Sequence, residues 1–133
     1  QQAVQVLRVA HSWPNRFVMG ILAVILAPAA EEVLFRGILY PAVKQFWSRR
    51  AALWYTSLLF AVVHSNFSAI FELKFSAFVS TLGTFLPLTL LALVLADLYE
   101  RTGNLLASIA AHSAFNTANF VMLYLMQNLS VQP

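Results

Sequence analysis

Three groups of polar side chains interrupt the apolar runs of this sequence, and each contains a side chain that could accept or donate a proton. In chain order the groups are Glu31-Glu32-x-x-x-Arg36, Phe60-x-x-x-His64 and His112-x-x-x-Asn116. An ionisable group inside a membrane costs about 2.5–3.5 kcal/mol at the helix centre on insertion scales, so such groups usually face a protein interior and carry function. The sequence therefore predicts that these side chains point toward other helices.

The first group contains two adjacent carboxylates that a helix would separate. Glu32 and Arg36 are four residues apart, share a helical face and can form an ion pair. Glu31 is turned about 100° away from Glu32 and has no such partner in the local sequence. A carboxylate in this setting could take a proton from water as a general base. The alternative is that both glutamates lie at the membrane surface.

The second group ends an apolar run at His64, with Phe60 one turn earlier on the same face. A single histidine at a helix end could equally be an interfacial residue. A further polar cluster, around Asp97 and Glu100, also ends an apolar run and is interpreted as an interfacial cap without catalytic chemistry.

The third group forms a polar stripe on an otherwise apolar helix. His112 and Asn116 share one face, and Ser108 and Asn119 extend it. Such a stripe must face other helices or trapped water. The alternative to a catalytic role is a hydrogen-bonded seam between two helices, which asparagine often provides.

The composition places these groups in a membrane. Of the 133 residues, 60% are hydrophobic and 10% are charged, whereas a soluble domain carries about 25% charged residues. We expect an all-α, multi-pass transmembrane bundle in which residues 1–133 form one catalytic core domain. Because the chain begins with Gln1, we also expect it to be a fragment that lacks upstream helices. Basic residues at the ends of apolar runs suit membrane lipid and not nucleic acid.

Four helices are expected from the apolar runs. They cover about residues 17–40, 51–63, 75–98 and 104–126. The first should end near Tyr40, before Pro41, and the second is short of the ~20 residues that cross a bilayer. Gly83 and Pro87 predict a kink in the third helix. Residues 65–74 are expected to form a loop or a short interfacial helix.

The three polar groups should lie at similar depth in the membrane. The reference points are basic residues in the connections between apolar runs. Glu31 is 13 residues from Lys44, His64 is 14 from Arg50 and His112 is 11 from Arg101. At ~1.5 Å rise per residue these separations are ~20, ~21 and ~17 Å. We therefore expect one buried polar cavity that holds Glu31, His64, His112 and Asn116.

The three groups, in this order and each on an apolar helix, resemble the motifs of the CPBP family (CAAX proteases and bacteriocin-processing enzymes, also called ABI), which includes the type 2 CAAX prenyl endopeptidases. The resemblance implies an intramembrane glutamic endopeptidase that cleaves membrane-associated or prenylated substrates. It implies that Glu31 and His64 activate water and that His112 and Asn116 form the oxyanion hole. The remaining positions, which look structural or substrate-orienting, are Glu32, Arg36 and Phe60.

Other chemistries stay open at this point. The chain has no cysteine, which excludes thiolate nucleophiles and thiolate metal sites. No cofactor is expected, but Glu31, His64 and His112 could bind zinc, although the His-Glu-x-x-His spacing is absent. A non-catalytic membrane scaffold or bacteriocin immunity factor is the main non-enzymatic alternative. A transporter fragment with a buried proton relay is a third class.

Overall fold

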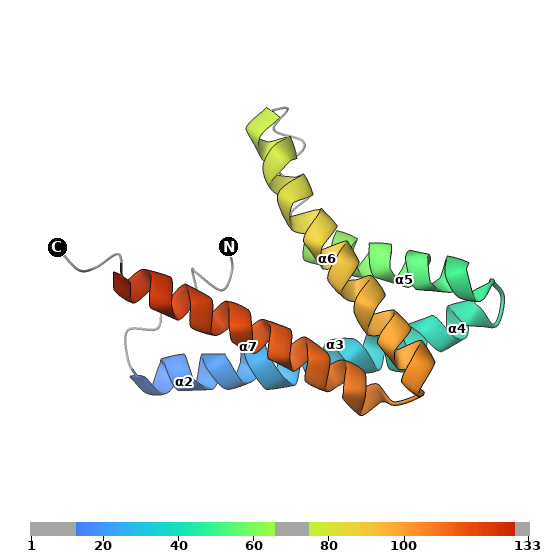
Figure 1. Ribbon diagram of the computed structural model, residues 1–133, viewed down its shortest axis with the longest axis horizontal. Helices are drawn as coiled ribbons and strands as arrows, with labels where there is room; N and C mark the ends of the chain where they lie inside the picture. Colours follow the sequence, from blue (N-terminus) through green and yellow to red (C-terminus); the bar gives the residue numbers. More distant parts are fainter. Residues whose placement is uncertain (1–12, 66–74, 130–133) are drawn as a thin grey trace. The chain divides into compact units, whose positions relative to one another are not determined.

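The structure is a computed structural model that describes residues 13–65 and 75–129. The described residues form helices and short connections without a strand, so the all-α prediction is confirmed. The elements are α2 (Trp13–Ile21), η1 (Leu22–Leu26), α3 (Ala27–Glu32), η2 (Val33–Leu39), α4 (Tyr40–Lys44), α5 (Arg49–His64), α6 (Phe75–Thr102) and α7 (Leu105–Leu129), where η marks a π-helix (Figure 1). The expected loop at 65–74 lies almost entirely outside the described residues.

Two π-helical segments interrupt the first long helix, and each precedes a proline. Pro28 follows η1 and Pro41 follows η2, in both cases as the second residue of the next α-helical segment. Proline has no N–H and its ring clashes with the carbonyl four residues earlier. A π turn is wider and pairs each carbonyl with the fifth residue, which relieves that clash. The prediction that the helix ends before Pro41 is therefore wrong, because the helix continues to Lys44.

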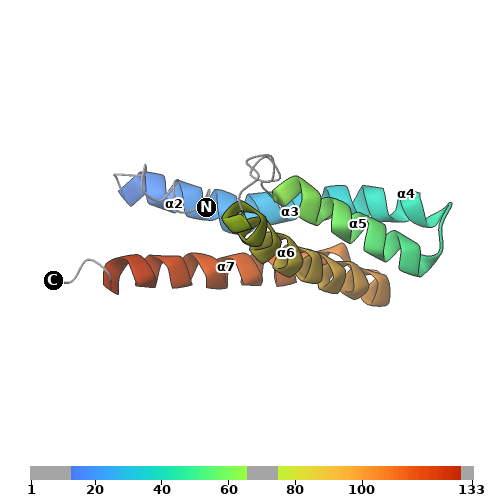
Figure 2. The ribbon, with the colours of Figure 1, turned by 90° about the horizontal axis from the view of Figure 1, so that it is seen from above.

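The chain divides into two compact units, of which unit 1 comprises residues 1–32 and 109–133. Its facing pairs are Gly20 with Phe120, Ala23 with Asn116 and Glu32 with His112. As one residue number rises, its partner's number falls, so the helix of residues 13–32 and α7 run antiparallel, side by side (Figures 1 and 2). Small residues on α7 allow this close approach.

Unit 2 comprises residues 33–108 and is built around the packing of α5 against α6. The Ser48 hydroxyl caps the start of α5 by accepting a hydrogen bond from the backbone N–H of Ala51. Its core is a cluster of Phe35, Phe60 and Ala92. Gly103 follows α6 with a φ of 61°, a left-handed conformation that glycine adopts without strain at a helix C-terminus.

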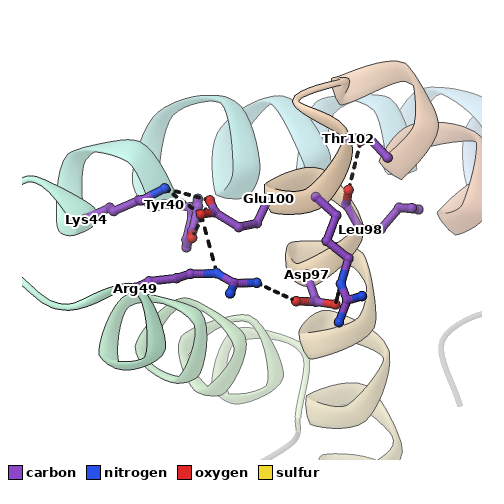
Figure 3. A network of polar contacts seen from close by, with 8 residues as sticks. Tyr40, Lys44, Arg49, Asp97, Leu98, Glu100 and Thr102 are labelled. Atoms are coloured by element: carbon purple, nitrogen blue, oxygen red, sulfur yellow. Dashed lines mark hydrogen bonds and ion pairs between the residues drawn. The ribbon is translucent and has the colours of Figure 1, made fainter.

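A network of charged side chains joins α4, α5 and α6 within unit 2 (Figure 3). Glu100 accepts hydrogen bonds from Tyr40 at 2.7 Å and from Lys44 at 2.6 Å. Arg49 bridges to Glu100 at 3.4 Å and to Asp97 at 2.9 Å. The acidic residues at the end of α6 thus hold helix ends together, in line with the structural role expected of them.

Two helices in the described part of the chain are long and apolar enough to cross a membrane. They span Phe17–Lys44 and Ser76–Thr102. Large apolar side chains along them are exposed, among them Ile38 at 59% and Leu90 at 64%, as expected for surfaces in contact with acyl chains. The 16-residue α5 is only about 24 Å long and is short for a span, as the sequence predicted.

Candidate active site

A buried hydrogen bond joins Glu32 and His112 within unit 1. Glu32 is the last residue of α3, and His112 lies within α7, 80 residues later. The Glu32 Oε1 atom is 2.8 Å from Nδ1 of His112, and the two side chains are 0% and 3% exposed. The carboxylate accepts and Nδ1–H donates, which fixes the orientation of the ring. Nε2 is then the ring nitrogen that remains for other chemistry.

Glu31 lies on the other side of the same imidazole. Its Oε2 atom is 3.7 Å from Nε2 of His112, just beyond hydrogen-bond distance. Its side chain is 27% exposed, whereas that of Glu32 is fully buried. Water can therefore reach Glu31 and not Glu32. The roles expected from the sequence, with Glu31 as the proton acceptor and Glu32 as a supporting residue, stay predictions.

Asn116 lies one turn after His112 in α7 and also contacts the facing helix. Its Nδ2 group donates a hydrogen bond to the backbone carbonyl of Ala23 at 3.0 Å. The side-chain amide has two N–H groups, so this bond leaves a second donor whose direction the first one constrains. Asn119, by contrast, donates to the Phe115 carbonyl of its own helix at 3.0 Å.

His64, in unit 2, is held by its own helix end. Its Nδ1 atom is 2.8 Å from the backbone carbonyl of Phe60, one turn earlier. A carbonyl only accepts hydrogen bonds, so Nδ1 carries the proton and donates it to this carbonyl. The imidazole also stacks on the Phe60 ring, with centroids 4.1 Å apart. His64 as a whole is exposed.

Phe60 and Arg36 form the support beneath His64. The buried Arg36 guanidinium lies 5.2 Å from the centroid of the Phe60 ring and donates to the Ala92 carbonyl at 2.9 Å. Phe35 packs edge-on against Phe60, with centroids 5.0 Å apart. The spacing Phe60-x-x-x-His64 thus has a local physical reason, since one residue supplies both the ring and the carbonyl that orient the histidine.

Two predictions involve residues from both units, and they stay predictions. One is the ion pair of Glu32 with Arg36. The other is the single cavity for Glu31, His64, His112 and Asn116, of which unit 1 gathers all but His64. Sequence reasoning missed the Ala23 carbonyl as a partner of the site.

The zinc prediction finds no ligand set in the described residues. Within 13–65 and 75–129, no three or more His, Cys, Asp or Glu side chains are placed to hold a metal ion. Glu31, Glu32 and His112 do come together, but Glu32 engages Nδ1 in a hydrogen bond and Glu31 lies nearer Nε2. Zinc binding stays a prediction, and we derive no step through a metal.

Comparison with known proteins identifies the family. The model of the Rce1-like type II CAAX prenyl endopeptidases matches residues 13–118, which is most of the chain and contains all three motifs. The chain belongs to this family. The predicted family resemblance is therefore confirmed, and with it membership of a group of membrane-embedded proteases.

A curated relative is also similar to this member of the Rce1-like family. It is the UPF0177 protein YxdF of Lactococcus lactis subsp. lactis (strain IL1403), 26% identical over 102 residues. The alignment covers 77% of this chain and 46% of the relative, so the chain spans about half the length of that protein. No solved structure matches the chain significantly.

Proposed function

We propose that the chain is the catalytic core of a multi-pass intramembrane endopeptidase that hydrolyses a peptide bond of prenylated or other membrane-associated substrates with water activated by Glu31. The observation that carries the proposal is the partly exposed Glu31 carboxylate beside a histidine that the buried Glu32 holds in place. Membership of the Rce1-like family supports the reaction class.

The first half of the proposed reaction activates water. Glu31 takes a proton from a water molecule as general base, and the oxygen attacks the carbonyl carbon of the scissile peptide. His64 orients the same water by accepting its other hydrogen at Nε2, while Nδ1–H donates to the Phe60 carbonyl. The lone pair of the water oxygen becomes the new carbon–oxygen bond, and the carbonyl oxygen becomes an oxyanion.

The second half stabilises and resolves that oxyanion. Asn116 donates its second amide N–H to the oxyanion. His112, with a proton on each ring nitrogen, donates its Nε2–H to the oxyanion while its Nδ1–H keeps donating to Glu32. Such donors are typically worth ~10²–10³ in kcat each. Glu31 then gives its proton to the leaving nitrogen as the carbon–nitrogen bond breaks. The products are an amine and a carboxylic acid, which releases its remaining proton to water, and Glu31 is regenerated.

The test is peptide cleavage by the full-length protein in proteoliposomes. The substrates are a prenylated C-terminal peptide and the same peptide without its lipid. We expect the wild type to cleave the prenylated peptide and Glu31→Gln and His64→Ala to lose cleavage, while Asn119→Ala, on α7 but bonded to its own helix, keeps it.

Other outcomes would identify the alternatives. Full biological activity of both Glu31→Gln and His64→Ala would assign the chain to the scaffold or immunity class. Metal analysis of the purified protein with chelator treatment tests zinc, since bound zinc together with chelator-sensitive cleavage would favour the zinc alternative over a water activated without a metal.

A further inference from the structure

The η1 segment contains a carbonyl that its own helix does not satisfy. In this π turn the backbone N–H of Ala27 donates to the carbonyl of Leu22, five residues earlier. The next carbonyl, that of Ala23, would by the same pattern receive the N–H of residue 28. Residue 28 is proline, which has no N–H, and Ala27, the α-helical donor, is already directed to Leu22.

Asn116 supplies the donor that the helix lacks. Its Nδ2 atom lies 3.0 Å from the Ala23 carbonyl oxygen. An unsatisfied backbone carbonyl costs several kcal/mol in lipid, so a side chain that reaches this oxygen is held there strongly.

We propose that Pro28 is a positioning residue for the active site. Because proline has no N–H, the Ala23 carbonyl is left as an acceptor for Asn116. That hydrogen bond directs the second amide N–H of Asn116 at the oxyanion. The catalytic part of this inference depends on the proposed function, whereas the hydrogen-bond part does not. Pro28 itself is fully buried.

The other prolines and amides of the chain supply matched controls. Pro87 also lies inside a long helix, but α6 stays α-helical through it, so Pro87→Ala controls for the loss of a helix proline. Asn119 controls for the general environment of α7, because its amide bonds to Phe115. Pro28→Ala restores a backbone N–H at the required position, and Pro28→Ser restores the same N–H with a different side chain.

The first experiment measures the hydrogen bond directly. Side-chain amide resonances of the 15N-labelled full-length protein in detergent micelles are assigned to Asn116 by their loss in Asn116→Ala. We expect the hydrogen-bonded amide proton to move toward the position of a free amide in Pro28→Ala and Pro28→Ser, and to stay in place in Pro87→Ala. An Asn116 resonance that is unchanged in both Pro28 variants would overturn the proposal.

The second experiment is a kinetic double-mutant cycle. Pro28→Ala should lower kcat about 10-fold, less than the ~10²–10³ of removing an oxyanion donor outright, with little change in KM. In an Asn116→Ala background it should have no further effect on kcat. An equal loss of kcat in both backgrounds would overturn the positioning role. If Asn116→Ala alone keeps the wild-type kcat, the oxyanion assignment fails instead, and the resonance shift still decides the hydrogen bond.

Discussion

His112 and His64 belong to one predicted reaction but are held by different kinds of support. His112 is buried within α7 and its ring lies between two carboxylates, Glu32 at Nδ1 and Glu31 near Nε2. His64 is the exposed last residue of α5 and is held by the carbonyl and ring of Phe60. Both supports engage Nδ1. A buried ring needs a charged side chain from another helix, whereas a ring at a helix end can use its own backbone.

The largest expected effect is the loss of kcat when either histidine is removed, and the two variants should differ in how well added imidazole can reach the empty site. His64→Ala and His112→Ala should each lower kcat about 100-fold or more, because each removes a proton-transfer or donor group. Added imidazole should restore part of the activity of His64→Ala, whose site is exposed, and none of that of His112→Ala, whose site is 3% exposed. Rescue is measured as cleavage rate against imidazole concentration. Equal rescue of both variants would contradict the comparison.

The support of His112 should matter for stability as well as for rate. Glu32→Ala leaves a buried ring nitrogen without its carboxylate, which costs about 1–3 kcal/mol or more for a charged partner. We expect a lower unfolding midpoint in a denaturation series together with a lower kcat. Glu32→Gln, which keeps an acceptor oxygen, should lose less stability. A wild-type midpoint for Glu32→Ala would show that this hydrogen bond does not support the site.

The Phe60 ring that supports His64 should contribute less to stability and to kcat than the Glu32 carboxylate that supports His112. Phe60→Leu removes the stacked ring but keeps the backbone carbonyl that orients Nδ1, and aromatic contacts of this kind contribute about 0.5–1.5 kcal/mol. We expect kcat to fall only a few-fold, with a stability loss of about 1 kcal/mol. A kcat loss as large as that of His64→Ala would show that the ring, and not the carbonyl, sets the orientation.

The smallest expected effect on catalysis is at the charged network of unit 2. Glu100→Gln weakens the contacts with Lys44 and Arg49 but touches neither histidine. We expect a stability loss of about 1 kcal/mol and an unchanged kcat, measured in the same unfolding and cleavage assays. A reduced kcat of Glu100→Gln at full stability would show that this network contributes to catalysis, which the comparison of His64 with His112 does not predict.

Much of the fold follows from the sequence, because hydropathy predicts where helices lie. The runs ending at His64 and beginning near Leu105 match α5 and α7 closely. Hydropathy does not report the hydrogen-bond register, so both π segments were missed. Their available signal was a proline inside an apolar helix, Pro28 and Pro41, which indicates a register change as readily as a helix end.

The sequence predicted which residues belong to the candidate site better than it predicted which atoms those residues contact. Spacing rules compare neighbours within a helix, so they offered Arg36 as a partner for Glu32. The structure gives Glu32 a partner 80 residues away, His112, which no local rule could find. The sequence also gave no sign of the Ala23 carbonyl as a partner, since patterns of side chains carry no information about backbone atoms.

The most direct test of the account compares Glu31→Gln with Glu32→Gln in cleavage and unfolding assays on the full-length protein. We predict that Glu31→Gln lowers kcat by ~10²–10⁴, the range of a general base, with an unfolding midpoint near that of the wild type. We predict that Glu32→Gln lowers the unfolding midpoint more and kcat less. A Glu31→Gln enzyme with wild-type kcat, or a Glu32→Gln enzyme that is fully stable and inactive, would contradict the assignment of Glu31 as the group that activates water.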